Sequence, residues 1–101
     1  MIIENTNPSL EYAGHDEGGG CMYRFNGVPF TGIIIFRHDS GIICQEISYV
    51  NGSENGRYRE YDIYGNLRIE YYIKLNILYG IRTEWDENGN VIETDDCGPE
   101  P

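Results

Sequence analysis

Serine, histidine and carboxylate side chains are the groups in this sequence that could do catalytic chemistry, yet no catalytic motif is present. An enzyme needs a nucleophile with a base and an orienting group, or two carboxylates facing each other across a cleft. The histidines, His15 and His38, fall in predicted loop and turn segments, where a solvated side chain is expected. The serines lie in predicted turns or at strand ends, without the Gly-x-Ser-x-Gly context of a nucleophile: Ser9, Ser40, Ser48 and Ser53. We therefore expect no enzymatic activity.

Metal and cofactor sites also lack a signature. The cysteines Cys21, Cys44 and Cys97 are widely spaced, without the CxxC or Cys/His clusters of a zinc site and without the even number of a disulfide framework. The DENGN segment at 86–90 lacks the acid spacing of a calcium loop. Gly18–Gly20 is followed by no Lys, Ser or Thr, so it is not a phosphate loop. We expect no cofactor and no metal.

The charge balance points to a protein partner instead. Seventeen acidic residues stand against seven basic ones, which gives a net charge of −10. Nucleic-acid backbones and anionic membranes attract Lys and Arg, so this chain is expected to bind neither. A one-signed surface speeds association with a basic protein, although plain solubility would explain the same charge. No apolar run reaches the roughly 18 residues of a membrane span and no basic leader opens the chain, so we expect a cytoplasmic protein.

The elements that position these residues come from an internal repeat. Glycine pairs at Gly32 and Gly41, then 24 and 48 residues further on, recur in register. Each second glycine is followed by an apolar residue and then an acid (Ile43 and Glu46, Leu67 and Glu70, Val91 and Glu93). A period between about 20 and 50 residues is typical of repeat architectures. The sequence therefore predicts three units of about 24 residues.

Composition and turn signals predict that each unit is a β-hairpin. Nine tyrosines, one alanine and one lysine favour strands over helices. Asn26-Gly27 and Asn51-Gly52 are strong hairpin turns, whereas Leu75–Tyr79 lacks this signal. Successive hairpins should join edge to edge. The predicted fold is all-β, an antiparallel meander of three repeated hairpins that forms a single curved sheet.

The predicted domain boundaries follow the limits of the repeat. Residues 1–20 lie outside it and are expected to be a flexible segment, in which Ile2 and Ile3 allow a short strand. Residues 21–94 form the repeat domain. Residues 95–101 are acidic and proline-rich, and we expect a frayed tail.

The repeat frame resembles the MORN-type repeat, and more closely the bacterial variant of that repeat. The best copy is GRYREYDIYGNL at 56–67, and the copy that starts at Gly80 is nearly as good. The first copy departs from the pattern, because Arg37 stands where Tyr61 and Trp85 stand in the later copies. The resemblance specifies the repeat more closely than it specifies a function, since proteins of many roles carry such repeats.

What the resemblance implies about function comes from the bacterial members. It covers residues 23–94. The bacterial variant includes antitoxins and immunity proteins, which are small and pair with a toxin encoded next to them. The implied function is neutralisation of a cognate basic toxin, such as a nuclease, by direct one-to-one binding. Two alternatives stay open: a scaffold module that self-associates through exposed sheet edges at Gly32–Arg37 or Val91–Thr94, and a carbohydrate-binding module that uses the aromatic residues.

Aromatic and acidic residues of the second and third units form the predicted binding surface. A one-layer sheet cannot bury every ring, and protein interfaces are enriched in Tyr and Trp. Seven acids and no base follow from Glu84 to the end. An aromatic patch with an acidic rim would suit a basic cleft, where its carboxylates mimic phosphate charge. The predicted partner-binding residues are Tyr58, Glu60, Tyr61, Asp62, Glu84, Trp85, Asp86, Glu87 and Glu93.

Overall fold

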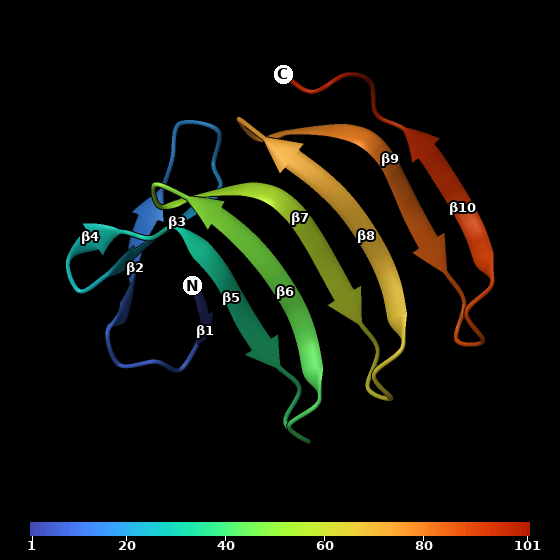
Figure 1. The fold of residues 1–101 in the computed structure, drawn as a ribbon, viewed down its shortest axis with the longest axis horizontal. Coiled ribbons are helices and arrows are strands. Elements are labelled where there is room, and N and C mark those ends of the chain that lie inside the picture. The colour runs from blue at the N-terminus through green and yellow to red at the C-terminus, as the bar shows by residue number, and fades with distance from the viewer.

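The computed structural model describes residues 1–101 and contains ten strands and no helix (Figure 1). Most strands pair antiparallel with their neighbours in sequence, which confirms the predicted all-β hairpin meander. The sheet is open. The strands are β1 (Ile2–Glu4), β2 (Leu10–His15), β3 (Cys21–Phe25), β4 (Val28–Pro29), β5 (Gly32–Arg37), β6 (Ile43–Val50), β7 (Ser53–Tyr61), β8 (Leu67–Lys74), β9 (Ile77–Trp85) and β10 (Val91–Asp96).

One end of the meander is closed by a turn in which an aspartate holds the backbone. At the β7–β8 turn the N–H of Asp62 bonds the carbonyl of Asn66 at 3.0 Å, and the N–H of Gly65 bonds the carbonyl of Asp62 at 3.1 Å. The carboxylate of Asp62 accepts the backbone N–H groups of Tyr64 and Asn66. Gly65 has a φ of 87°, a conformation that glycine adopts without a steric penalty. The β5–β6 and β9–β10 turns have the same backbone bonds, with His38 in place of the aspartate in the β5–β6 turn, and a register shift between the paired strands lies next to each of the three turns.

The other end is closed by tight two-residue turns with positive φ at both positions. Asn51-Gly52 joins β6 to β7 in this way. Leu75-Asn76 joins β8 to β9 with φ values of 53° and 61°, although it lacks glycine. These are the values of a type I′ turn, whose twist matches that of the flanking strands. Leu75 therefore occupies a conformation that is unfavourable for its side chain, and the turn is set by the pairing of the strands around it.

The N-terminal segment forms a fourth hairpin and is not the loose segment that the sequence predicted. The N–H of Asp16 bonds the carbonyl of Gly20 and the N–H of Gly19 bonds the carbonyl of Asp16, as in the β7–β8 turn. The Asp16 carboxylate accepts the N–H groups of Gly18 and Gly20. The glycine run is thus an aspartate turn between β2 and β3. The short strand expected at Ile2 and Ile3 is present as β1, which pairs parallel with β5.

This hairpin covers one part of the main sheet. The strand order is β1-β5-β6-β7-β8-β9-β10, and β3 connects to this sheet through a pair between Met22 and Ser53. In Figure 1 the strands β2, β3 and β4 gather at the β5–β7 end, while β10 lies at the far end. Residues of β2 and β3 pack against the core cluster, which consists of Ile3, Phe30, Ile34, Ile47, Tyr49 and Tyr58. No residue of β9 or β10 is buried or packs against this cluster, so these two strands form a single layer.

The C-terminal tail begins later than predicted. Strand β10 runs through Asp96, and the N–H of Cys97 bonds the carbonyl of Gly80 at 2.8 Å. The N–H of Gly80 bonds the carbonyl of Gly98, also at 2.8 Å. Residues 95–98 therefore belong to the sheet, because backbone pairing with β9 continues past the last apolar position of the repeat.

Replacing Ile34 with alanine should strongly destabilise the fold. Its side chain has no exposed surface, so the substitution removes buried methyl groups and leaves a cavity between the hairpin and the sheet. We expect the free energy of unfolding to fall by about 2–5 kcal/mol in urea denaturation. Ile63→Ala is the matched control, because Ile63 is 58 % exposed in a turn and should change stability by under about 0.5 kcal/mol. Equal losses for the two variants would contradict this location of the core.

Candidate functional site

Side chains of the main sheet divide between two faces. Residues directly opposite each other in paired strands lie on the same face, and neighbours along a strand lie on opposite faces. We call the face that carries Ile34, Ile47 and Tyr58, which the N-terminal hairpin covers over β5–β7, the inner face. The other is the outer face. No residue of β9 or β10 packs against the core cluster, so the inner face is uncovered over these two strands.

A row of acidic residues crosses the inner face toward its uncovered part. Glu60 of β7 is opposite Ile69 of β8, Ile69 is opposite Glu84 of β9, and Glu84 is opposite Glu93 of β10. We call these three glutamates the inner carboxylate row. Directly opposite side chains have their Cβ atoms about 5 Å apart, so Glu84 and Glu93 are close neighbours, and Glu60 is separated from Glu84 by Ile69.

The charges of this row are not balanced within the chain. Glu84 and Glu93 are directly opposite each other, and like charges in such a pair are destabilising. Arg82 Nη2 lies 3.2 Å from Glu84 Oε1 and its Nη1 lies 3.8 Å from Asp95 Oδ2, which leaves Glu93 without an ion pair. Glu60 accepts a hydrogen bond from the Tyr58 hydroxyl at 2.7 Å but has no cationic partner. The row therefore retains free negative charge.

The equivalent row on the outer face includes an arginine between two acids. Glu46, Arg59 and Glu70 are directly opposite one another in succession on β6, β7 and β8. Arg59 Nε lies 2.7 Å from Glu70 Oε2, and the hydroxyl of Tyr61 donates to Glu46. Arg59 therefore separates the two acids of the outer row, whereas Glu84 and Glu93 of the inner row are directly opposite each other.

A shallow hollow adjoins the inner carboxylate row. Its volume is about 250 Å³ and its lining includes the carboxylates of Glu60, Asp62 and Glu84 and one guanidinium, that of Arg68. Arg68 is directed to other groups, since its Nη1 lies 3.7 Å from Asp62 Oδ2 and its Nε donates to the Trp85 carbonyl at 2.8 Å. The hollow is open to solvent and predominantly negative. A lysine or arginine side chain of a partner would fit it in charge.

The structure brings together only some of the residues predicted to bind. Glu60, Glu84 and Glu93 share the inner carboxylate row. Tyr61 and Trp85 follow Glu60 and Glu84 in sequence and therefore lie on the outer face. Tyr61 nevertheless contributes to the lining of the hollow beside Glu60 and Glu84, whereas Trp85 lies beside Asn66, Leu67 and Gly89 in another hollow. The predicted aromatic patch with an acidic rim is therefore present only in part, without Trp85.

Tyr58 is a core residue. Its side chain is only 8 % exposed, and its ring stacks on that of Tyr71 with centroids 4.3 Å apart and an interplanar angle of 9°. Burial, assisted by the hydrogen bond to Glu60, raises the pKa of Tyr58 to about 12. Its hydroxyl also accepts a hydrogen bond from Gln45 at 2.7 Å. Tyr58 therefore supports the inner carboxylate row by holding Glu60, without being accessible to a partner.

Asp62, Asp86 and Glu87 lie in the turns at one end of the sheet. The backbone N–H groups of Asn90 and Asn88 donate to Asp86 Oδ1 at 3.0 and 2.8 Å, which lowers the pKa of Asp86. Asp62 has the same role in its own turn. These two aspartates are primarily structural, whereas Glu87 is exposed and adds to the negative charge near the row.

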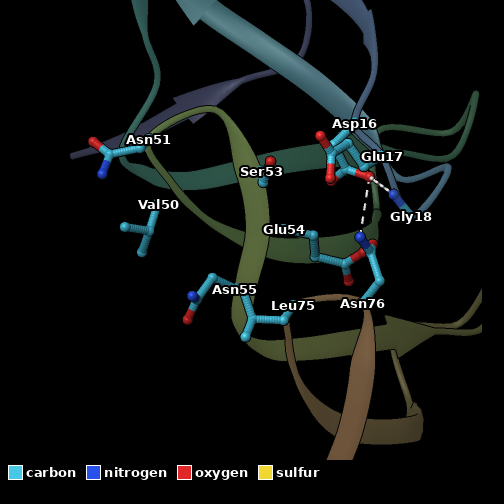
Figure 2. Close-up of a pocket in the computed structure, with 10 residues that line it drawn as sticks. All are labelled: Asp16, Glu17, Gly18, Val50, Asn51, Ser53, Glu54, Asn55, Leu75 and Asn76. Carbon is cyan, nitrogen blue, oxygen red and sulfur yellow. Dashed lines mark hydrogen bonds between the residues drawn. The ribbon is translucent and has the colours of Figure 1, made fainter. Parts of the chain in front are cut away.

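A second hollow, which the sequence did not indicate, lies where the N-terminal hairpin meets the main sheet (Figure 2). Its volume is about 650 Å³, and Asp16, Glu54 and Asn76 contribute to its lining. Asn76 Nδ2 donates to Asp16 Oδ1 at 3.0 Å and so connects the β2–β3 turn to the β8–β9 turn. No cluster of three His, Cys, Asp or Glu side chains in the protein could hold a metal ion. The only sequence signal for this contact is the likeness of Asp16-Glu17-Gly18-Gly19 to the turn at 86–89.

Glu54 is the half-buried carboxyl of this second hollow. Burial raises the pKa of Glu54, and the Tyr71 hydroxyl, which donates to Glu54 Oε1 at 3.4 Å, opposes the shift only in part. The folded state therefore binds a proton at Glu54 more tightly than the unfolded chain does. Ionisation of Glu54 at neutral pH costs stability.

Comparison of the chain with family models, with curated proteins and with solved structures gave no match. The structure contains no helix that could cross a membrane.

Replacing Glu54 with glutamine should stabilise the protein at pH 7 and lose this effect in acid. The amide keeps the acceptor for Tyr71 and removes a charge that burial disfavours. Below the ordinary pKa of 4.5 the carboxyl of Glu54 is protonated in both the folded and the unfolded chain, so it costs no stability, and the cost appears as pH rises. The gain in stability from glutamine should therefore vanish near pH 4. Urea denaturation at pH 7 and at pH 4 measures the difference in the free energy of unfolding between the variant and the original protein. Glu17→Gln, an exposed change in the same hollow, is the control, and an equal gain at both pH values would contradict the assignment.

Proposed function

We propose that the protein is an immunity or antitoxin protein that binds a cognate toxin directly and neutralises it. In this proposal the inner carboxylate row and the hollow beside it face a basic surface of the toxin. The observation that carries the proposal is the unbalanced charge of Glu60, Glu84 and Glu93 on the inner face, with Glu84 and Glu93 on its uncovered part. The resemblance of the repeats to the bacterial MORN variant supports the choice of a toxin as the partner.

The inner carboxylate row suits a basic protein for electrostatic reasons. Within the chain Glu93 has no cation, and Glu84 shares one arginine with Asp95. Lysine or arginine side chains of a partner would supply the missing opposite charges and remove the repulsion across β9 and β10. The net charge of −10 would in addition speed the encounter with a basic surface.

Inhibition of a toxin by covering its active cleft requires no catalytic group in this protein. A nuclease that binds phosphates uses a cleft rich in Lys and Arg, and carboxylates presented by a rigid sheet can occupy that cleft in place of the substrate. The inner carboxylate row extends over the four consecutive paired strands β7 to β10, so its charges are positioned before binding. Such preorganisation lowers the entropic cost of association.

Co-expression with the protein encoded by the adjacent gene tests the proposal. If the adjacent gene encodes the toxin, its expression alone should arrest growth, and the present protein should restore growth and co-purify with it in a one-to-one complex. A neighbour that is harmless and does not bind would overturn the proposed function.

Glu93→Lys should make the free protein more stable and the complex weaker. The change converts the like-charge pair with Glu84 into an opposite-charge pair, worth about 0.2–1 kcal/mol in urea denaturation. It should also slow association with the toxin, most at low salt, in surface plasmon resonance.

The matched control is Glu70→Lys on the outer face. This change breaks the pair with Arg59, so it should lower stability and leave toxin binding within about twofold. If Glu93→Lys left association unchanged while the complex still formed, the inner carboxylate row would not be the binding surface.

A further inference from the structure

The free edge of β10 is a second feature of the acidic end of the sheet. We propose that the partner adds an extended, basic segment to this edge as a further antiparallel or parallel strand. This inference rests on the proposed function and specifies how the partner docks. Its basis is the position of β10 in the sheet, the charges along it and the absence of any cover from the chain itself.

Strand β10 is the last strand of the sheet and pairs only with β9. All six of its residues are exposed. From Glu93 to Asp96 it pairs in regular register with residues 84 to 81 of β9. Half of the backbone N–H and C=O groups along this stretch point away from β9, and such groups are a template for another strand.

The hydrogen bond from the Cys97 N–H to the Gly80 carbonyl identifies the outward groups. In an antiparallel pair, alternate residues turn their backbone groups toward the partner strand. Asp95 and Glu93 therefore face β9 with Cys97, and Thr94 and Asp96 turn their N–H and C=O groups outward. An added strand would bond to Thr94 and Asp96.

The other free edges are less suited to strand addition. Strand β1 at the opposite end of the sheet has three residues, and β4 has two. Strand β2 is as long as β10, but its pairing is interrupted between Tyr12 and His15. Short or irregular edges are typical devices against unwanted pairing.

The chain does not cover the β10 edge with its own C-terminal residues. Gly98 and Cys97 bond to Gly80 on β9. Beyond them, Glu100 Oε2 lies 3.4 Å from Lys74 Nζ of β8, which directs the tail back across the sheet. The outward side of β10 is left to a partner.

The side chains of β10 decide which partner fits. Glu93, Asp95 and Asp96 are three of the four residues in the regular stretch, so a second copy of this chain would set acids against acids in either direction. A segment with Lys or Arg opposite Glu93 and Asp95 would instead give Glu93 its missing cation. Because Glu93 turns its backbone toward β9, the side chain opposite it on the added strand would sit in the closer type of pair. The added strand would thus extend the inner carboxylate row with positive charge.

The test uses an eight-residue peptide that alternates lysine with valine. Amide hydrogen exchange followed by NMR should show new protection at Thr94 and Asp96 when the peptide is added, with little change at Glu93 and Asp95. Binding should weaken as salt is raised. Protection confined to other strands, or none at a peptide concentration that saturates an acidic surface, would overturn the inference.

Two controls separate backbone pairing from simple charge attraction. The same peptide with N-methyl groups on its valines keeps its charge and loses backbone donors, so its affinity should fall at least tenfold. Glu93→Gln combined with Asp95→Asn should weaken binding roughly three- to tenfold. Glu11→Gln combined with Glu17→Gln, at exposed acids of the N-terminal hairpin, should change it by less than about twofold. Equal binding of the two peptides would show that charge alone acts.

Binding of the toxin and binding of the peptide test different parts of the proposal. A toxin that binds normally and protects neither Thr94 nor Asp96 would overturn the strand addition and leave the proposed function standing. A peptide that binds at β10 while no toxin is found would overturn the proposed function alone.

Discussion

The aspartate turn is the interaction on which the arrangement of this protein depends. In each such turn the carboxylate fixes the backbone at one end of a hairpin, and a glycine with positive φ lets the following strand start with a register shift. Register then decides the face of every side chain beyond the turn, because a one-residue slip would exchange the two faces. The pairing of Glu60 with Ile69 across the Asp62 turn and of Glu84 with Glu93 across the Asp86 turn is set in this way.

The buried core and the uncovered acidic surface occupy different parts of one sheet. The first part is covered by the N-terminal hairpin and contains all the buried side chains, including Phe30 and Ile34. The last strands have one layer and little buried surface, so a charge repulsion such as that between Glu84 and Glu93 weakens only the local pairing. A surface can carry unfavourable charges where the fold does not depend on it.

Glycine spacing and turn residues were sufficient to predict the hairpin meander, because both act locally. The fourth hairpin was missed because Asp16 precedes His38 by 22 residues, whereas His38 and Asp62 are 24 apart. The parallel pairing of β1 with β5 depends on long-range packing that no local signal encodes. For the site, Glu46, Glu70 and Glu93 occur once in each unit, a spacing that suggests one shared face of the sheet. Glu93 lies one residue short of the 24-residue spacing between Glu46 and Glu70, so it is on the inner face while Glu46 and Glu70 are on the outer face.

The contact between Asp16 and Asn76 limits how far the N-terminal hairpin extends along the sheet. The N-terminal hairpin has a fixed length and already reaches the β8–β9 turn, so a unit added beyond β10 would lie outside its reach. Lengthening the array there by duplication would enlarge the one-layer surface and leave the core as it is, so binding area could evolve without repacking the interior.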